Sequence, residues 1–424
     1  MKKKVLQRIC SLLMVVSMIL GIVGCAKTPE PTPNNDNPGN TDKPVVQEVE
    51  IADIFVESQM EFSVDLFKEV VKNGENENLM ISPLSVSTAL AILAEGSDTK
   101  TKEELESTLS GYLSLEELTD FLSSYLKNLP TGEKCKFVYA NAIWANEKDG
   151  LKINEDFLKF ASDTYGADIK KGPFTNKTVW EINKWVYKNT DGMIDKILKE
   201  LPPDAVMCIL NAVAFDAEWK DRYEKDDIEK KTFTSYSGKE QKIDFMNSRE
   251  EYLFEDEYAA GFKKKYKGGN YSFVALLPYE GVDVNDYVSQ LTPRGIKEML
   301  DNYTYADVHA SIPKFESEYE VEMNDILKGL NLNHMFDKKE ADFSKLGVSD
   351  GKNIYVHEVK HKTYISVDEV GTKASAVTSV IMNELATAAP SEPVEIILDR
   401  PFVYMIIDES TNLPIFMGVL YDVQ

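Results

Sequence analysis

The sequence predicts one large α+β domain that spans residues 51–424. Apolar residues at helical spacing are concentrated before residue 130 and again near residue 190, whereas β-branched and aromatic runs recur through the rest of this region. No internal repeat and no second linker divides it. A chain of 424 residues can bury a large core, so these segments are expected to pack together as one body.

Two helices have clear boundaries in the sequence. Apolar residues at helical spacing from Phe62 predict a helix that stops at Asn73-Gly74. A second helix is expected to begin after Ser82, an N-cap residue, with Pro83 in its first position, and to stop at Gly96. It is apolar on nearly all sides and should be buried. Two further helical stretches are expected at residues 102–129 and 179–201.

Strands are predicted wherever β-branched, aromatic and apolar residues run together between turn residues. Seven such runs stand out, at residues 137–144, 207–215, 271–278, 306–315, 354–367, 401–407 and 414–421.

The N-terminus is a targeting segment. Residues 1–24 combine a cationic start with an apolar run that is short for a membrane span, and Ile-Val-Gly-Cys at 22–25 resembles a bacterial lipoprotein box. We expect Cys25 to be lipidated, with an ordinary secretory signal cut nearby as the alternative. Residues 25–50 are rich in Pro, Asn and Asp and form a disordered tether. The domain is therefore expected outside the cytoplasm, at a cell surface or facing a periplasm.

The charge balance restricts the partners. The formal net charge is −24, and loss of the four positive charges in residues 1–24 would make it −28. Such a chain is not expected to bind nucleic acid or heparin-like polyanions, or to touch a membrane except through its anchor. Cys135 and Cys208 lie in apolar runs and are expected to be two buried thiols rather than a disulfide. Cysteine spacing suggests no zinc site, and no cofactor or metal is expected.

Two short motifs resemble enzyme sites. His357 and His361 match HExxH, but the surrounding alternating run predicts a strand, which would hold the two imidazoles about 13 Å apart. Residues 347–351 match GxSxG, but within a polar turn and without the strand and helix that a nucleophile elbow needs. A hydrolase is therefore disfavoured, and the protein is not expected to be an enzyme.

Residues 369–382 form the most informative stretch. At a period of two, one face carries only small or apolar residues, and the other face is more polar. Gly371 lies just before this small face begins at Thr372, where a backbone hinge would need conformational freedom. The segment that follows is polar or small and rich in proline, as an exposed loop would be. The small face consists of Thr372, Ala374, Ala376, Thr378, Val380 and Met382.

The region from about residue 51 to the end resembles the serpins. The resemblance is carried, in the order of the family, by the segments at residues 78–85, 210–219, 311–315, 325–332, 341–344, 369–382, 400–404 and 414–418. It implies a serpin fold: a large central mixed β-sheet, further sheets, surrounding helices and an exposed reactive loop. It also implies a suicide inhibitor of serine proteases. The target enzyme cleaves the loop and forms an acyl-enzyme, and the freed hinge inserts into the main sheet as a new strand.

The resemblance assigns roles residue by residue. The proximal hinge comprises Glu369, Gly371, Thr372, Ala374, Ser375, Ala376 and Val377. The breach at the top of the sheet comprises Trp219, Lys314 and Glu369, and the shutter beneath it comprises Ser82, Ser85, Asn211 and His361. Lys373 departs from the family, which usually has an acid there. Alternation directs Lys373 outward after insertion, so the departure should be tolerated.

The scissile bond is placed by the spacing usual in the family. Counting from Gly371 gives Leu385-Ala386, and the long loop leaves Met382, Glu384 and Ala388 as alternatives. Leu385 would suit a chymotrypsin- or subtilisin-like pocket, whereas an alanine would suit an elastase-like one. Papain-like cysteine proteases are a further target class. A covalent 1:1 complex and a monomeric inhibitor are expected, and the competing hypothesis is a non-inhibitory serpin that acts as a binding module.

Overall fold

The computed structural model describes residues 45–146, 150–201, 205, 207–350, 353–372 and 392–423, with side chains from residue 52 onward. The region Val45–Gln424 is a single compact unit. None of the helices in the described ranges is both long enough and apolar enough to cross a membrane.

Helices are concentrated in the first half of this unit. The first described helix starts at Val45, which lies before the predicted domain start at residue 51. The α-helices are α2 Val45–Asn73, α3 Pro83–Gly96, α4 Thr99–Leu109, α5 Leu115–Asn128, α6 Glu155–Tyr165, α7 Asn176–Asn189, α8 Val284–Gln290, α9 Pro293–Asp301 and α10 Asn324–Gly329. Two 3₁₀ turns, Lys225–Asp227 and His334–Phe336, complete them.

Strands form two large sheets, both of mixed direction. The six-stranded sheet has the order β11 Phe315–Glu322, β13 Lys360–Val367, β14 Gly371–Thr372, β5 Met207–Glu218, β2 Cys135–Asn146 and β4 Asp168–Gly172. The nine-stranded sheet has the order β1 Leu79–Ile81, β17 Pro414–Leu420, β16 Phe402–Asp408, β9 Tyr271–Pro278, β8 Ala259–Lys265, β7 Glu240–Glu255, β10 Thr304–Pro313 and β15 Val394–Ile397, with β6 Ile228–Thr234 paired to β7. A small ladder joins β12 Gly347–Val348 to β3 Lys152–Ile153.

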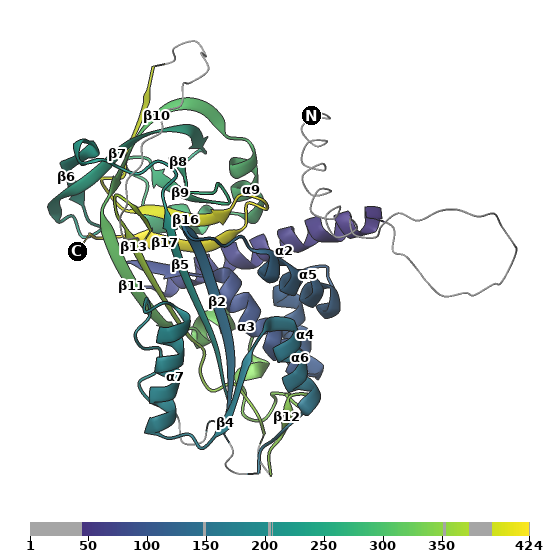
Figure 1. Cartoon of the computed structure of the whole chain (residues 1–424). Coiled ribbons are helices and arrows are strands. Elements are labelled where there is room, and N and C mark those ends of the chain that lie inside the picture. Colours follow the sequence, from purple (N-terminus) through teal and green to yellow (C-terminus); the bar gives the residue numbers. More distant parts are fainter. Residues whose placement is uncertain are drawn as a thin grey trace, which may run out of the picture. The chain divides into compact units, whose positions relative to one another are not determined.

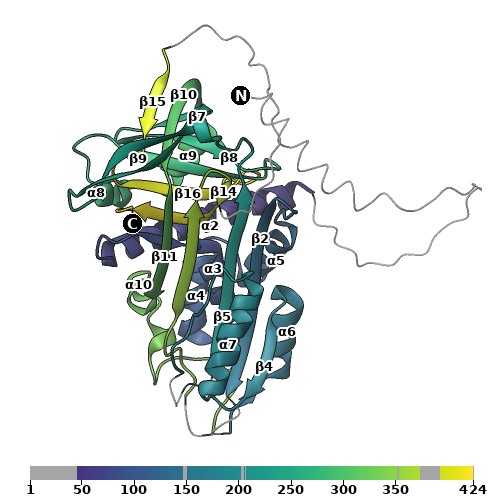
Figure 2. The same cartoon turned by 60° about the vertical axis from the view of Figure 1, so that its left-hand side comes forward.

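β2 and β5 of the six-stranded sheet are covered on both faces. Figure 1 shows α7 on one side of β5 and β2, and α3 to α6 on the other; Figure 2 shows the long strands side by side behind α7. Alternation explains this arrangement: Ala142 and Trp144 of β2 face Ile182 of α7, whereas Ile143 faces the main core. β2 and β5 are therefore largely apolar on both sides, as buried strands are, whereas β13 has Lys360 and Lys362 on its outer face.

Most predicted elements are confirmed, with ends that differ by a few residues. Ser82 caps α3, Pro83 is its first residue, and the helix is almost wholly buried. The predicted strand at 306–315 is two strands separated by Lys314. The stretch predicted as helical at 102–129 is broken between α4 and α5 by Gly111, which has a φ of +56°.

Two sequence predictions are wrong. The strand expected at 354–367 begins only at Lys360, because the preceding backbone bonds to loops: Val356 N–H donates to Met335 and Val359 N–H to the Asn324 side chain. The helix expected at 179–201 ends at Asn189, because Gly192 adopts a φ of +78° that a continuing helix does not allow.

The two cysteines are free thiols, as predicted, at opposite ends of the β2–β5 ladder. Cys135 is buried, whereas Cys208 is only partly buried, which corrects the expectation of two buried residues. Burial raises the pKa of both thiols to about 12, so neither is an activated nucleophile.

The two enzyme-like motifs lie in different settings. His357 lies in the irregular segment before β13, where its carbonyl accepts from the Asn324 side chain, whereas His361 lies on β13. The distance between the two imidazoles expected for a continuous strand therefore does not apply to this pair. Within the described ranges, no group of three or more His, Cys, Asp or Glu residues is placed to hold a metal ion. The start of the GxSxG motif is the strand β12 rather than a turn, and the described residues after it, 353–359, are not helical.

Candidate functional site

The centre of the six-stranded sheet lacks a full strand. β13 pairs along its whole length with β11, and β5 pairs along its whole length with β2. Between the facing edges of β13 and β5 the only described ladder is that of β14, which has two residues at the upper end. Below β14 the two edges have no ladder partner among the described residues, although they belong to one sheet. Such edges are templates for another strand.

We call this unpaired gap between β13 and β5 the slot, and a cavity of about 120 Å³ lies at its lower end, away from β14. Met207, Ile209 and Asn211 of β5 line one side. Lys360 and His361 of β13, with residues 354–359, line the other. The floor comes from the apolar face of α3, with Val86, Ala89, Leu90 and Leu93.

A tight turn carries the chain from β13 into β14. The Asp368 carboxylate accepts from Val370 N–H at 2.8 Å and from Gly371 N–H at 3.1 Å, and Asp368 N–H donates to Gly371 O. Two further backbone hydrogen bonds hold this turn: Trp219 N–H donates to Val370 O, and Tyr223 N–H donates to Glu369 O. The chain is thereby turned back so that Gly371 and Thr372 enter the sheet.

Gly371 is required for a reason that the sequence did not reveal. Its Cβ position would lie 2.0 Å from the Ala217 carbonyl oxygen and 2.7 Å from the Glu218 Cα atom. Only glycine allows β14 to approach β5 so closely. The φ of Gly371 is not positive, so in this state the glycine is needed for space, and its predicted freedom as a hinge stays a prediction.

Thr372 is the deepest described residue of the hinge. Its side chain is buried, and its hydroxyl shares a 2.6 Å hydrogen bond with the Tyr266 phenol. Tyr266 in turn stacks on Trp219 with 4.5 Å between ring centroids, and the Trp219 indole N–H donates to Asp368 O at 2.8 Å. The predicted small face of residues 369–382 therefore begins inside the sheet.

Lys314 and Glu369 form the ion pair that the breach assignment anticipates. The Lys314 ammonium lies 2.7 Å from the Glu369 carboxylate, and both side chains are partly exposed. This contact holds the pKa of Glu369 below its usual range. It joins the loop between β10 and β11 to the turn before β14, so it lies across the upper end of the slot.

The first turn of α3 contacts both strands that border the slot. Ser82 N–H donates to the His361 Nε2 atom at 3.1 Å, and Thr363 Oγ1 donates to Met80 O at 2.7 Å just before the helix. On the other side, the Ser85 hydroxyl donates to the Asn211 carboxamide. The four predicted shutter residues are therefore brought together around one helix N-terminus.

His361 must be neutral to make its contact. Its Nε2 atom accepts a backbone N–H, which requires the proton to reside on Nδ1. Burial lowers the pKa of the imidazole to about 4, so it is uncharged at neutral pH.

Sequence reasoning missed three residues of this site. Asn141 lies opposite Asn211 in the β2–β5 ladder and accepts its amide at 2.6 Å. A lone asparagine in the apolar run 137–144 was the signal that could have identified it. Thr363 follows His361 by two residues and lies on the same face of β13, so the alternation could also have identified it. Nothing in the sequence near Tyr266 indicates its contact with Thr372.

Other predicted site residues lie outside the described residues. They are Cys25 of the anchor; Lys373, Ala374, Ser375, Ala376 and Val377 of the hinge; and Met382, Glu384, Leu385, Ala386 and Ala388 around the expected scissile bond.

The sequence model of the serpin (serine protease inhibitor) family matches residues 57–423. The chain belongs to the serpin family. An uncharacterised serpin-like protein of Thermococcus kodakarensis is 30% identical over 430 residues, which cover 96% of this chain and 97% of that protein. Human neuroserpin is 28% identical over 85% of this chain and 90% of its own length.

Solved serpin structures resemble the fold. The native state of tengpin, a thermophilic serpin, has a TM-score of 0.82 and 46% identity, covering 87% of this chain and 94% of that chain. These matches confirm the predicted serpin fold. Members of this family are in general inhibitors of proteases rather than enzymes.

Proposed function

We propose that this serpin inhibits serine endopeptidases of the chymotrypsin, elastase or subtilisin type by loop cleavage, acyl-enzyme trapping and insertion of the hinge into the six-stranded sheet. Papain-like cysteine proteases are a further target class. The observation that carries the proposal is β14: a two-residue strand that already lies between β5 and β13, at the upper end of a slot with no other strand. Cleavage would free the residues after Thr372 to continue this strand downward.

The hinge sequence suits the slot. Continuation at a period of two directs Ala374 and Ala376 to the same face as buried Thr372, and the antiparallel register of β14 would place them opposite Phe215 and Val213 of β5. About 14 inserted residues at about 3.3 Å each would carry the cleaved end tens of Å along the sheet. A protease attached there as an acyl-enzyme would move with it.

The energetics favour insertion. About ten new ladder hydrogen bonds at a net ~1 kcal/mol each give a gain on the order of 10 kcal/mol, before side-chain burial is counted. The uncleaved form persists because a barrier separates it from the inserted form, so its stability is kinetic. The Lys314–Glu369 pair and the contacts of Ser82 and Ser85 with both strands contribute to that barrier.

A gel assay tests the proposal directly. Incubation with chymotrypsin or elastase should give an SDS-stable 1:1 complex and a small C-terminal fragment. The mass of this fragment identifies the scissile bond, for which we propose Leu385-Ala386. Cleavage without any stable complex would show a substrate rather than an inhibitor. Resistance to every protease tested would instead favour a non-inhibitory binding module.

We also propose that Cys25 is lipidated and that the residues from Cys25 to the start of α2 at Val45 tether the domain to the extracytoplasmic face of a bacterial membrane, at a cell surface or facing a periplasm. The sequence at 22–25 supports this proposal. Detergent extraction of the expressing cells followed by mass spectrometry should show an acylated N-terminal peptide. The variant Cys25→Ser should appear in the soluble fraction, and recovery of that variant with the membrane would contradict the proposal.

A further inference from the structure

The register of β14 determines where an extension of this strand would lie in the six-stranded sheet. Thr372 lies opposite Ala217 of β5, and the ladders of β14 with β5 and with β13 are both antiparallel. A strand that continues by one residue therefore places residue 373 opposite Asp216 of β5 on one side and Ser366 of β13 on the other. This position is the first one beyond the described strand.

An inserted residue 373 would face the outer side of the sheet. Side chains alternate along a strand, and Thr372 points to the inner, buried side. On β5 the even-numbered residues point outward, since Leu210 and Ala212 pack in the cluster beneath α7. Asp216 follows the same alternation and is only partly buried. The side chains of residues 216 and 373 would therefore meet on a half-open surface.

Carboxylates border this position on both sides. Asp216 lies directly opposite on β5. On the other side, the Ser366 hydroxyl donates to the Glu316 carboxylate of β11 at 3.4 Å. Opposite charges that face each other across neighbouring strands attract, and like charges destabilise the pairing. A lysine is therefore favoured at this position in the inserted strand, and an acidic residue is disfavoured.

The next outward residue of β5, Glu218, contributes little to this preference. Its carboxylate already lies among three cations, with Lys134 at 2.7 Å, Arg222 at 2.6 Å and Lys267 at 3.5 Å. These cations largely cancel its charge for any further group. Asp216 is therefore the carboxylate that determines which charge suits the position opposite.

We propose that Asp216 is a positioning residue for loop insertion, and that Lys373 pairs with it when the strand extends past Thr372. The inference rests on the insertion mechanism proposed above. Lys136 of β2 lies opposite Asp216 on its other side, so charges would alternate across the sheet from Lys136 through Asp216 to Lys373. The pair explains why this chain has a lysine where the family usually has an acid: an acid would face Asp216.

The pair would act at the start of insertion. It forms with the first residue added to β14, before the rest of the strand, so it favours insertion over release of the protease by deacylation. It also favours the correct register, because a slip of one residue would turn Lys373 toward the buried face. An ion pair on a half-open surface adds little to overall stability. Its effect should therefore appear in the partition between complex and cleaved serpin.

Charge reversal tests the pair. Asp216→Lys, Lys373→Asp and the double variant are each incubated with chymotrypsin or elastase, and the ratio of cleaved serpin to SDS-stable complex is measured. Each single reversal places like charges opposite each other and should raise this ratio about threefold or more. The double variant restores opposite charges and should return to within about twofold of the wild type. This rescue is the deciding result, because Asp216→Lys also faces Lys136.

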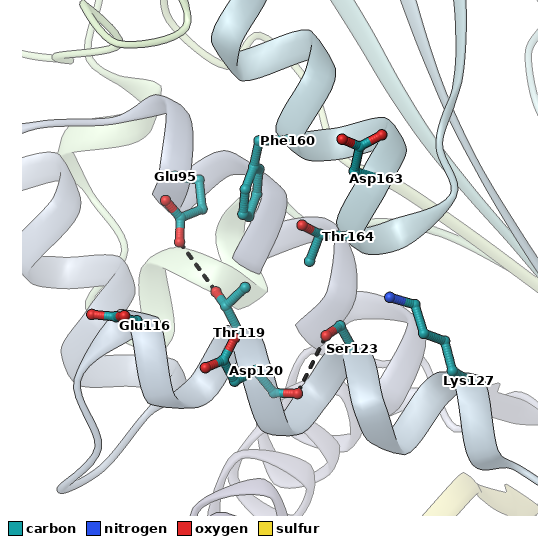
Figure 3. Close-up of a pocket in the computed structure, with 9 residues that line it drawn as sticks. All are labelled: Glu95, Glu116, Thr119, Asp120, Ser123, Lys127, Phe160, Asp163 and Thr164. Atoms are coloured by element: carbon teal, nitrogen blue, oxygen red, sulfur yellow. Dashed lines mark hydrogen bonds between the residues drawn. The ribbon is translucent and has the colours of Figure 1, made fainter. Parts of the chain in front are cut away.

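Two further variants serve as controls. Asp163→Lys changes the net charge equally, but Asp163 lies on α6 at a cavity between α3, α5 and α6 (Figure 3), and it should leave the ratio unchanged. Lys373→Ala removes the attraction without adding repulsion, so its complex should persist. If Asp216→Lys fails to fold, Lys373→Asp should still give a higher ratio than Lys373→Ala. Equal ratios in those two variants, an equal rise in Asp163→Lys, or no recovery in the double variant would overturn the pair.

A second readout separates this inference from the proposed mechanism. After the loop is cut by a protease that forms no complex, the wild type should gain heat resistance, because insertion adds a strand to the sheet. Each single reversal should reduce this gain, and the double variant should recover it. No gain in the wild type would contradict the insertion mechanism itself. A gain in the wild type without recovery in the double variant would overturn only the role of Asp216.

Discussion

The hydroxyl of Thr372 lies 2.6 Å from the phenol oxygen of Tyr266, and both residues are buried. The first residues of the hinge are thus already part of the six-stranded sheet before any protease acts. Strand formation is costly to start and easy to extend, since each added residue then gains a ladder bond. Because Gly371 and Thr372 already pair with the neighbouring strands, this first step is complete before cleavage.

We expect Thr372→Arg to convert the inhibitor into a substrate. The guanidinium would have to be buried beside Tyr266 without a partner, which costs several kcal/mol and slows insertion relative to deacylation. SDS gels with the target protease should show cleaved serpin and no stable complex. Lys373→Ala is the control, because alternation directs residue 373 outward; it should keep the complex. A stable complex in Thr372→Arg would refute insertion along this face.

Ala374→Pro should have the same effect by another route. Proline lacks the N–H that a central strand needs, so the ladder would stop two residues after Thr372. The ratio of cleaved serpin to stable complex should rise, whereas the initial rate of cleavage should stay similar. An unchanged ratio would mean that residue 374 does not enter the sheet.

Gly371→Ala should expel β14 from the sheet. The new methyl group would meet the Ala217 carbonyl oxygen at 2.0 Å, and we expect a cost of about 1–3 kcal/mol. Hydrogen exchange of the Thr372 amide should accelerate, and the thermal midpoint should fall. Gly172→Ala in β4 is the matched control, because nothing lies within 4 Å of its Cβ position. Equal protection of Thr372 in both variants would contradict this account of Gly371.

The Lys314–Glu369 pair should contribute modestly to the barrier. Both side chains are partly exposed, so a double-mutant cycle with Lys314→Ala and Glu369→Ala should give a coupling of about 0.2–1 kcal/mol in the unfolding barrier. The coupling should shrink at 1 M salt. Because the pKa of Glu369 is lowered in the fold, this stabilisation is present above the ordinary pKa of about 4.3 and is lost as pH falls through the folded value. No coupling at low salt would exclude the pair as part of the barrier.

His361 should make the native state sensitive to acid. Its pKa is about 4 in the fold and about 6.5 when unfolded, so the unfolded chain binds more protons between these values. Stability should therefore fall as pH drops from about 6.5 to about 4, by about 3 kcal/mol, and level off below. His361→Gln should start from a lower thermal midpoint and lose less of it over this range. Parallel pH profiles for the two proteins would contradict the assignment.

Local patterns in the sequence were sufficient for much of the fold. The capping pattern Ser82-Pro83 predicted α3 correctly, and alternating or apolar runs located most of the long strands. One prediction failed because of contacts that the local pattern does not contain. Residues 354–359 have a strand-like composition, but their backbone bonds to loops around Met335 and Asn324. The short strands β1, β3 and β12 were missed because two or three residues carry no periodicity. The longer strands β6, β7 and β8 were also missed; their many charged residues interrupt the apolar runs that identified the other strands.

The sequence by itself determined the family resemblance, the small face that begins at Thr372, and the set of residues that meet beneath the sheet. Only the tertiary structure decided that Gly371 is needed for space, that Tyr266 holds Thr372, and that Asn141 extends the network from Asn211. Periodicity reports which face of an element is buried, but contacts between distant segments depend on how the sheets pack, and no local pattern records that packing.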